Sequence, residues 1–429
     1  MQAIHDTLRS MRGVTLLPNV RFVQLQLASL EHSLQFLLGV ASFCLLEVCL
    51  TWRDQSAIDD RPRQQTLLRN FTTILSLCPS FQTLYLTMTA ASVDLRTLSD
   101  ALHTCEYLRF VSLIIEGYHR GLGSTSVESG TNGDRLTELL TYLSSIPCLR
   151  ELELRNGVLS ESADHDTEVA ITSPSLVFRD LTKVFVDVGP GTDAFYKALF
   201  TTCHFPILRS CVLRVASTLC SALPALLKST VSVKALQTLH VSFWQRASVL
   251  IARIGFVELR PLSVFTSLQS LRIAGRDFTI ELGDHHWESM ARGWPHIRHF
   301  DIEDGVGGGD DNTVTVLRPS YKSLAHFVRL CPKLTQITLT LRDEHPLDTD
   351  ELDSLPVSDR PIVLHLWHST FRNFDPPARW IARMFPRLRL LTHATGYRVG
   401  YGITNPFLTY RHESWVELFD QVKSIRRRT

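Results

Sequence analysis

The sequence predicts an α/β solenoid, with a curved parallel sheet on the concave side and helices on the convex side. The chain has 429 residues. A single hydrophobic core rarely grows beyond about 250–300 residues, so the chain must divide into domains or extend by repetition. One apolar pattern recurs along most of the chain, and segments with a helical period lie between its copies. Together these observations favour a stack of strand–helix units.

The recurring pattern is a small or apolar residue, often Pro, followed by x-L-x-x-L-x-L. Its copies are LPNVRFVQL (17–25), SFCLLEVCL (42–50), CPSFQTLYL (78–86), CEYLRFVSL (105–113), IPCLRELEL (146–154), FRDLTKVFV (178–186), FPILRSCVL (205–213), VKALQTLHV (233–241), FTSLQSLRI (265–273), WPHIRHFDI (294–302), CPKLTQITL (331–339) and FPRLRLLTH (385–393), with a degenerate copy at RPIVLHLWH (360–368). The last two apolar positions alternate with other residues, which is typical of a strand that buries one face.

The first apolar residue of each copy serves as an anchor in the predicted core. The anchors are Val20, Leu45, Phe81, Leu108, Leu149, Leu181, Leu208, Leu236, Leu268, Ile297, Leu334, Val363 and Leu388. Consecutive anchors are 25 to 41 residues apart. This spacing predicts an irregular solenoid of thirteen units, each of about 31 residues, over residues 1–395.

Helices are predicted between the copies. The segments with a helical period are 64–77, 94–105, 134–146, 193–203, 321–331 and 378–385. In each segment, apolar residues recur three and four positions apart and form one apolar face. A strand with a returning helix can bury its apolar surface only against its neighbours, so stacked units place the strands inside an arc and the helices outside it.

Residues 396–429 are predicted to cap the end of the stack. Within them, 412–429 has the pattern of an amphipathic helix with Trp415, Leu418, Phe419 and Val422 on its apolar face. Three insertions interrupt the units. Segments 121–134 and 305–312 are rich in Gly, and the acidic segment 342–360 is expected to be mobile.

The L-x-x-L-x-L cores resemble leucine-rich repeats over roughly residues 17–393. An Asn or Cys usually follows the last leucine of such a repeat by three residues. Its place is taken here by Thr89, Gly157, Ala216, Gly305 and Arg342. Irregular copies with CP and FP headers look like the C-terminal repeat regions of fungal F-box-type proteins. The resemblance implies the substrate-binding part of an F-box ubiquitin-ligase subunit.

In that family the F-box is a helical segment, usually opening with L-P-x-E, that docks on a Skp-type adaptor. We expect no such segment in this chain, because Leu17-Pro18 leads directly into the first predicted strand. A Skp-type adaptor is therefore expected as a partner only if an F-box exists outside the chain.

Composition excludes several classes of protein. A hydrophobic fraction of 44% is too high for a disordered chain. The formal net charge of +1 gives no general attraction to nucleic acid or to an anionic membrane, so neither is expected as a partner. The apolar run 33–46 is shorter than the roughly 20 residues that span a bilayer. Nine cysteines without C-x-x-C spacing indicate reduced thiols and a cytoplasmic or nuclear protein.

The candidate binding residues lie between and beside the paired apolar positions of the strands, so they point away from the core. They combine both charge signs with aromatic rings, and aromatic and Arg side chains dominate protein-binding hot spots. A polar sheet face without any ligand is the alternative. The predicted concave-face residues are Tyr85, Phe110, Glu151, Glu153, Arg155, Lys183, Phe185, Asp187, Arg214, His240, Arg272, His299, Asp301, Glu303, His365 and Trp367.

No metal, cofactor or catalytic site is predicted. His296 and His299 would face opposite sides of a strand, and no Cys or carboxylate completes a ligand set with His285 and His286. The segment 305–312 lacks the G-K-[ST] end of a phosphate-binding loop, and its two Asp residues would repel phosphate. Nucleophile-elbow, H-E-x-x-H and dinucleotide-binding patterns do not occur.

The predicted function is non-enzymatic recognition of a protein target through the concave face, as in the substrate-binding part of an F-box ubiquitin-ligase subunit. A free-standing leucine-rich-repeat interaction scaffold, unconnected to ubiquitination, is the alternative. An enzyme that places a site on the arc is a third hypothesis, and no feature of the sequence favours it.

Overall fold

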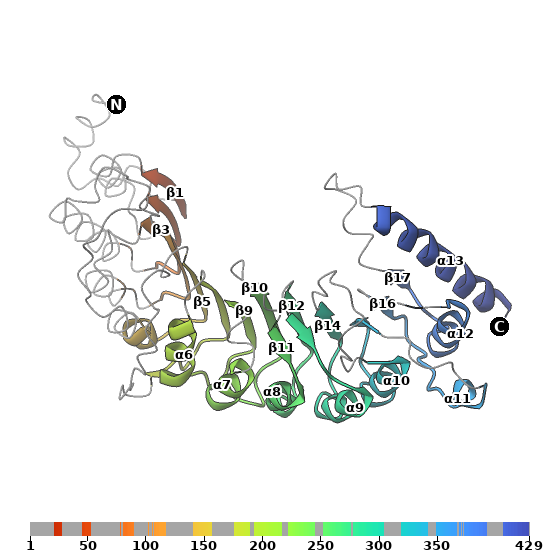
Figure 1. Ribbon diagram of the computed structural model, residues 1–429. Coiled ribbons are helices and arrows are strands. Elements are labelled where there is room, and N and C mark those ends of the chain that lie inside the picture. Colours follow the sequence, from red (N-terminus) through yellow and green to blue (C-terminus); the bar gives the residue numbers. More distant parts are fainter. Residues whose placement is uncertain are drawn as a thin grey trace, which may run out of the picture. The chain divides into compact units, whose positions relative to one another are not determined.

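The structure is a computed structural model (Figure 1). It describes residues 21–27, 45–52, 78, 80–89, 102, 105, 107–116, 140–156, 176–188, 193–216, 222–244, 252–275, 278–303, 319–341, 349–366, 369, 371, 373–392 and 406–428.

The chain is a mixed α/β protein with a large parallel sheet. Among the described residues this main sheet has 13 strands, which follow one another in chain order. They are β1 (Phe22–Leu27), β2 (Glu47–Trp52), β3 (Thr83–Thr89), β4 (Phe110–Glu116), β5 (Glu151–Asn156), β7 (Lys183–Val188), β9 (Ser210–Ala216), β10 (Thr238–Trp244), β12 (Ser270–Gly275), β14 (His299–Glu303), β15 (Gln336–Thr338), β16 (Val363–His365) and β17 (Leu390–Thr392). Two small parallel sheets pair β6 (Leu176–Val177) with β8 (Cys203–His204), and β11 (Ala252–Ile254) with β13 (Phe278–Ile280).

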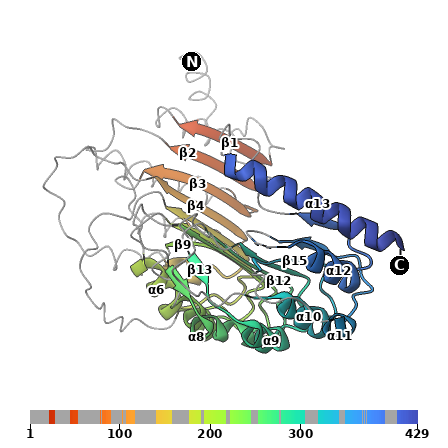
Figure 2. The same cartoon turned by 45° about the vertical axis from the view of Figure 1, so that its right-hand side comes forward.

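The chain divides into two compact units. The first comprises residues 1–215 and 229–232, and the second comprises 216–228 and 233–429. In the first unit the parallel strands lie side by side from β1 to β9, and Figure 2 shows β1 to β4 in red to orange. In the second unit they run from β10 to β17. The predicted boundary at residue 395 falls in 393–405, outside the described residues, and stays a prediction.

Each strand of the main sheet lies in one copy of the recurring pattern. When the residues of each copy are numbered 1 to 9, twelve of the 13 strands begin at position 6. In those twelve copies the anchor at position 4 is buried in every case from Leu45 to Leu388, and Val20 lies outside the described residues. Positions 7 and 9 are buried as well in the nine copies from 78–86 to 331–339, for example Leu152 and Leu154 in β5, whereas Leu391 at position 7 of the last copy is half-buried. The predicted apolar core is therefore confirmed in these nine copies.

A repeated backbone hydrogen bond joins neighbouring copies at position 5. The carbonyl of Arg109 accepts the N–H groups of Arg150 and Glu151, at 2.8 and 3.0 Å. The carbonyl of Arg150 in turn accepts those of Thr182 and Lys183 at the same distances. Because neighbouring copies within each unit are bonded through this carbonyl, residues with the same position number lie next to one another across the sheet.

The alignment of the degenerate copy is corrected by the structure. Val363 pairs with Gln336 of β15 and with Leu390 of β17, and both of these residues occupy position 6. The prediction that Val363 is an anchor is therefore wrong, and the anchor position falls on the exposed Pro361, 27 residues from both Leu334 and Leu388. A shift of two residues keeps every side chain on the same face of a strand, so alternation alone could not reveal the error.

Helices lie along one side of the strands within the second unit, as Figure 1 shows for α8, α9 and α10. The helices are α6 (Asp193–Thr202), α7 (Leu223–Thr230), α8 (Phe256–Leu259), α9 (Asp284–Gly293), α10 (Tyr321–Leu330), α11 (Thr349–Asp353), α12 (Asp375–Met384) and α13 (Pro406–Arg428), with a 3-10 helix η3 (Arg260–Val264). The predictions over 193–203 and 321–331 are confirmed to within one residue.

The other helix predictions have mixed outcomes. The segment predicted at 378–385 begins three residues earlier, because two prolines occupy the first turn of α12, where a missing N–H costs no hydrogen bond. Residues 140–145 are helical within 134–146. The segment 64–77 lies outside the described residues, as does most of 94–105.

The acidic segment 342–360 contains a helix instead of forming only a mobile loop. Its residues 349–353 form α11, where Glu351 accepts hydrogen bonds from the Tyr321 hydroxyl at 2.8 Å and from Lys322 Nζ at 3.1 Å. These two bonds tie α11 to the first turn of α10. The segments 121–134 and 305–312 lie outside the described residues.

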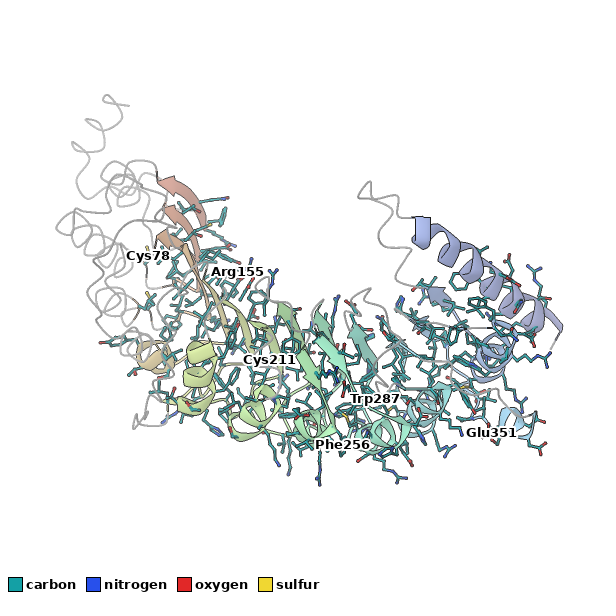
Figure 3. All side chains as sticks on the ribbon, in the orientation of Figure 1. Cys78, Arg155, Cys211, Phe256, Trp287 and Glu351 are labelled. Atoms are coloured by element: carbon teal, nitrogen blue, oxygen red, sulfur yellow. The ribbon has the colours of Figure 1, made fainter. Side chains whose placement is uncertain are left out.

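An aromatic cluster fills the space between α9, α10 and β14. The Phe300 ring lies 4.4 Å from Phe327, 5.5 Å from Trp287 and 5.9 Å from Trp294, measured between ring centres. All four side chains are buried, and Trp287 projects from its helix toward the strands (Figure 3). Trp294 also donates its indole N–H to the carbonyl of Leu262 at 3.0 Å. Large rings with this offset geometry gain energy beyond the area they bury.

The C-terminal helix packs beside α12, as Figures 1 and 2 both show. It starts at Pro406, six residues before the predicted start. Leu418 and Val422 are buried and Phe419 is half-buried, which confirms this part of the predicted apolar face. The Trp415 side chain lies outside the described part of the chain. Within that part, no helix combines the length and the apolar character needed to cross a bilayer.

Candidate protein-binding surface

Positions 6, 8 and 10 of the copies point to the face of the main sheet that is opposite to the buried positions 7 and 9. We call this the polar face. The structure describes fifteen of the 16 predicted binding residues, and all fifteen occupy these positions with none buried. Trp367 lies outside the described residues. The exposure of the fifteen side chains agrees with the predicted orientation, and their role in binding stays a prediction.

Charged side chains in the first unit are paired with one another. The pairs are Arg155–Glu153, Lys183–Glu151 and Arg214–Asp187. Lys183 Nζ lies 2.9 Å from Glu151 Oε1, and these two residues are direct neighbours in the register of β5 and β7. The pairs are partly exposed to solvent, so each contributes at most about 1 kcal/mol to stability. Their main effect is to hold long side chains in fixed positions on the surface.

Aromatic rings lie among these pairs. The ring centres of Tyr85 and Phe110 are 4.8 Å apart on β3 and β4. The guanidinium carbon of Arg155 lies 4.9 Å from the centre of the Phe185 ring, within the range of a cation–π contact. Burial raises the pKa of Tyr85, and the nearby carboxylates of Glu47 and Glu153 raise it further. The phenol therefore stays protonated and can donate a hydrogen bond to a partner.

Separate groups of hydrogen-bonded polar side chains lie on the polar face in the second unit. Arg272 Nη2 donates to both carboxylate oxygens of Glu303, at 2.9 and 3.1 Å. Asp301 lies opposite Arg272 in the register, yet its carboxylate accepts hydrogen bonds from Gln336 Nε2, at 3.0 and 3.2 Å, and from the Thr338 hydroxyl. The Arg272 guanidinium is thus bonded to the carboxylate of Glu303, while the carboxylate of Asp301 accepts its hydrogen bonds from uncharged side chains.

Sequence reasoning missed the residues that hold Asp301. Gln336 and Thr338 occupy positions 6 and 8 of the copy at 331–339, the same positions as the predicted residues in other copies. Applying the position numbers to every copy would have found them. Their polar but uncharged side chains gave no signal of their own, and only the hydrogen bonds show that they orient the carboxylate.

Two histidines at position 8 of this face are half-buried. His240 Nε2 lies 3.1 Å from Ser270 Oγ, and His365 Nδ1 hydrogen-bonds with Thr392 Oγ1. Burial lowers the pKa of His240, and the positive charge of Arg272 lowers it further, although Asp301 opposes the shift. Burial likewise lowers the pKa of His365, against the opposing effect of Asp301. Both rings are therefore held in the neutral form.

We expect the second unit to lose stability as the pH falls below about 6.5, the pKa of histidine in an unfolded chain. A histidine with a lowered folded-state pKa binds more protons when unfolded, so its contribution is complete above that pH and is lost as the pH falls toward the folded-state value. Urea unfolding at pH 7.5 and 5.5 measures the effect. The double variant His240→Gln/His365→Gln should show a smaller loss between the two pH values than the wild type. An equal loss of stability in both proteins would show that His240 and His365 do not cause the pH dependence.

The other histidines considered as metal ligands do not form one cluster. His285 and His286 lie on α9, with ring centres 3.8 Å apart, and His286 also stacks on Phe256 at 4.6 Å. His286 Nδ1 accepts the N–H of Gly283, and His299 lies on the polar face in β14. Within the described ranges, no group of three His, Cys, Asp or Glu side chains is arranged to hold a metal ion.

No protein-family model matches the sequence, and no curated protein matches it either.

Proposed function

We propose that the chain is an irregular leucine-rich-repeat solenoid that recognises a protein target through its polar face. Three structural features support the repeat architecture. Successive copies supply successive parallel strands, the position-4 anchor is buried in the eleven copies from Leu45 to Leu388 that keep this anchor, and the position-5 carbonyls bond one copy to the next within each unit. A stack of this kind exposes aligned side chains from many strands on one face, which suits extended contact with another protein.

The observation that carries the binding proposal is the arrangement of charged and aromatic side chains on the polar face. Arg155 lies over Phe185 in the first unit, and Arg272 forms its two bonds with Glu303 in the second. Arg and aromatic side chains held in fixed positions are the groups that supply most of the energy in protein interfaces. Because these exposed contacts add little to folding stability, their order is better explained by recognition than by a structural requirement.

The connection to ubiquitination rests on the resemblance to fungal F-box-type proteins. In that role the polar face would hold a substrate, and an F-box encoded outside this sequence would dock on a Skp-type adaptor. A free-standing interaction scaffold would use the same face without an adaptor. Either role places the protein in the cytoplasm or the nucleus, in keeping with the buried free thiols of Cys203, Cys211 and Cys331.

Arg272→Glu is expected to abolish most target binding. The change places a carboxylate beside Glu303 and Asp301, so it removes the only guanidinium bonded to Glu303 among the described residues and reverses the charge offered to a partner. In affinity purification with quantitative mass spectrometry, the amount of the main partner recovered with the variant should be about tenfold lower than with the wild type. A tenfold change in affinity corresponds to about 1.4 kcal/mol. Arg383→Glu is the matched control, because Arg383 is an exposed arginine on α12 and the charge change is the same.

Equal partner sets for Arg272→Glu, Arg383→Glu and the wild type would overturn the proposal. Unfolding curves of all three proteins separate a loss of binding from a loss of folding. The F-box role is tested by translating the genomic sequence ahead of residue 1 and by measuring co-purification with a purified Skp-type adaptor. If the full-length protein never binds the adaptor, the scaffold function replaces the ligase function.

A further inference from the structure

A second row of side chains in the first unit lies outside the polar face. It is formed by position 5, the residue just before each strand. Backbone hydrogen bonds connect Arg109 to Arg150, Arg150 to Thr182 and Thr182 to Arg209, each with an N–O distance of 2.8 Å. Strands in a sheet are about 4.8 Å apart, so this row of four residues extends for roughly 14 Å. We call it the basic rim.

The three arginines of the basic rim are exposed and have no acidic partner among the described residues. The carboxylates of the polar face do not neutralise them, because Glu151 is bonded to Lys183 and Asp187 to Arg214. Asp180 in the turn before β7 adds one negative charge, and its neighbour Arg179 offsets it. Among the described residues of the first unit, the basic rim is therefore a local concentration of positive charge, on a chain whose formal net charge is +1.

Exposed apolar side chains accompany the arginines. Tyr107 precedes Arg109 by two residues and is 53% exposed, and Ile207 precedes Arg209 by two residues and is 41% exposed. Both occupy position 3 of their copies, where the turn leads into the strand. An Arg row between an exposed aromatic ring and an exposed aliphatic side chain has the composition of a protein interface.

The chemistry of the basic rim favours carboxylates on a protein segment. Arg binds carboxylate with two parallel hydrogen bonds, and its weak hydration makes the pairing favourable at an interface. Nucleic acid is a poorer fit. Three arginines would neutralise about three phosphates, which gives little affinity at physiological salt. Ile207 also offers no ring on which a base could stack.

We propose that the basic rim is a second docking surface, which binds an acidic segment of a partner protein that also carries apolar side chains. The carboxylates would pair with Arg109, Arg150 and Arg209, while the apolar side chains would cover Tyr107 and Ile207. The surface lies within the first unit and does not depend on the polar face, so either proposal can fail while the other holds.

The test uses the full chain and a fluorescein-labelled peptide of about twelve residues, rich in Glu with Leu at intervals, which is long enough to span the row. Fluorescence anisotropy should detect binding that weakens as salt is raised. The triple variant Arg109→Glu/Arg150→Glu/Arg209→Glu should lower the affinity at least tenfold. Tyr107→Ala/Ile207→Ala should lower the affinity while leaving its salt dependence unchanged, because no charge is removed.

The matched control is Arg260→Glu/Arg329→Glu/Arg383→Glu, which changes the net charge equally at exposed positions of the second unit. It should bind the peptide as the wild type does, and urea unfolding should show that both triple variants are folded. An equal loss in the control, or no peptide binding by the wild type, would overturn the proposal. A single-stranded oligonucleotide of equal charge that binds more tightly through the same three arginines would overturn it in favour of nucleic acid.

Discussion

Replacing Phe300 by alanine is expected to lower the free energy of unfolding by about 3–5 kcal/mol, the usual cost of truncating a fully buried Phe. The ring is in contact with Trp287, Trp294 and Phe327, and its side chain is 0% exposed. Alanine would leave a cavity between β14 and two helices that these rigid rings cannot fill, and three ring contacts would be lost. Urea unfolding followed by circular dichroism measures the effect.

Two further variants control for the change at Phe300. Phe300→Leu keeps most of the volume and should cost less than half as much as the alanine change. Phe22→Ala truncates a ring that is 51% exposed on β1, and it should change the stability by no more than about 0.5 kcal/mol. If Phe300→Ala were as mild as Phe22→Ala, the aromatic cluster could not be the centre of this part of the core.

Asp284→Ala is expected to lower the free energy of unfolding by about 2–3 kcal/mol, from the loss of hydrogen bonds to a charged group. Asp284 begins α9, yet its carboxylate bonds the start of α10. It accepts the N–H groups of Ser320 and Ser323 at 2.8 and 3.2 Å, and their hydroxyls at 2.7 and 2.6 Å. Alanine would leave the buried Ser323 hydroxyl and the first-turn N–H groups of α10 without this acceptor. Denaturant unfolding at neutral pH measures the loss.

Asp284→Asn and Asp420→Ala complete this experiment. The amide keeps one acceptor oxygen, so the free energy of unfolding of Asp284→Asn should lie between those of the wild type and Asp284→Ala. Asp420 forms an exposed pair with Lys423 at 3.7 Å, and its removal should cost about 0.5 kcal/mol or less. Similar effects of Asp284→Ala and Asp420→Ala would show that the four bonds to α10 contribute little.

The strands of this protein could be predicted because each one repeats the same local pattern. In β5, for example, Leu152 and Leu154 alternate with Glu151 and Glu153, and a strand places such alternating residues on opposite faces. The same rule placed the fifteen described residues of the polar face correctly. It failed at Val363, where an exposed proline occupies the anchor position and a shift by two residues leaves the alternation intact.

The contacts that connect distant residues could not be predicted in this way. Asp284 is 36 and 39 residues from its two serine partners, and the local sequence of neither α9 nor the start of α10 indicates that they are in contact. The hydrogen bonds from Gln336 and Thr338 to Asp301, and the bonded row of Arg109, Arg150 and Arg209, likewise arise only when separate copies lie side by side.

The sequence by itself determined the apolar core positions of most copies and the polar face of their strands, because the hydrophobic period depends only on residues close together along the chain. Only the tertiary structure decided which polar residues meet, how His240 and His365 are shielded from solvent, and where arginines gather without acidic partners in the described first unit. Those properties depend on the register between strands about 30 residues apart, and a backbone hydrogen bond between copies sets that register.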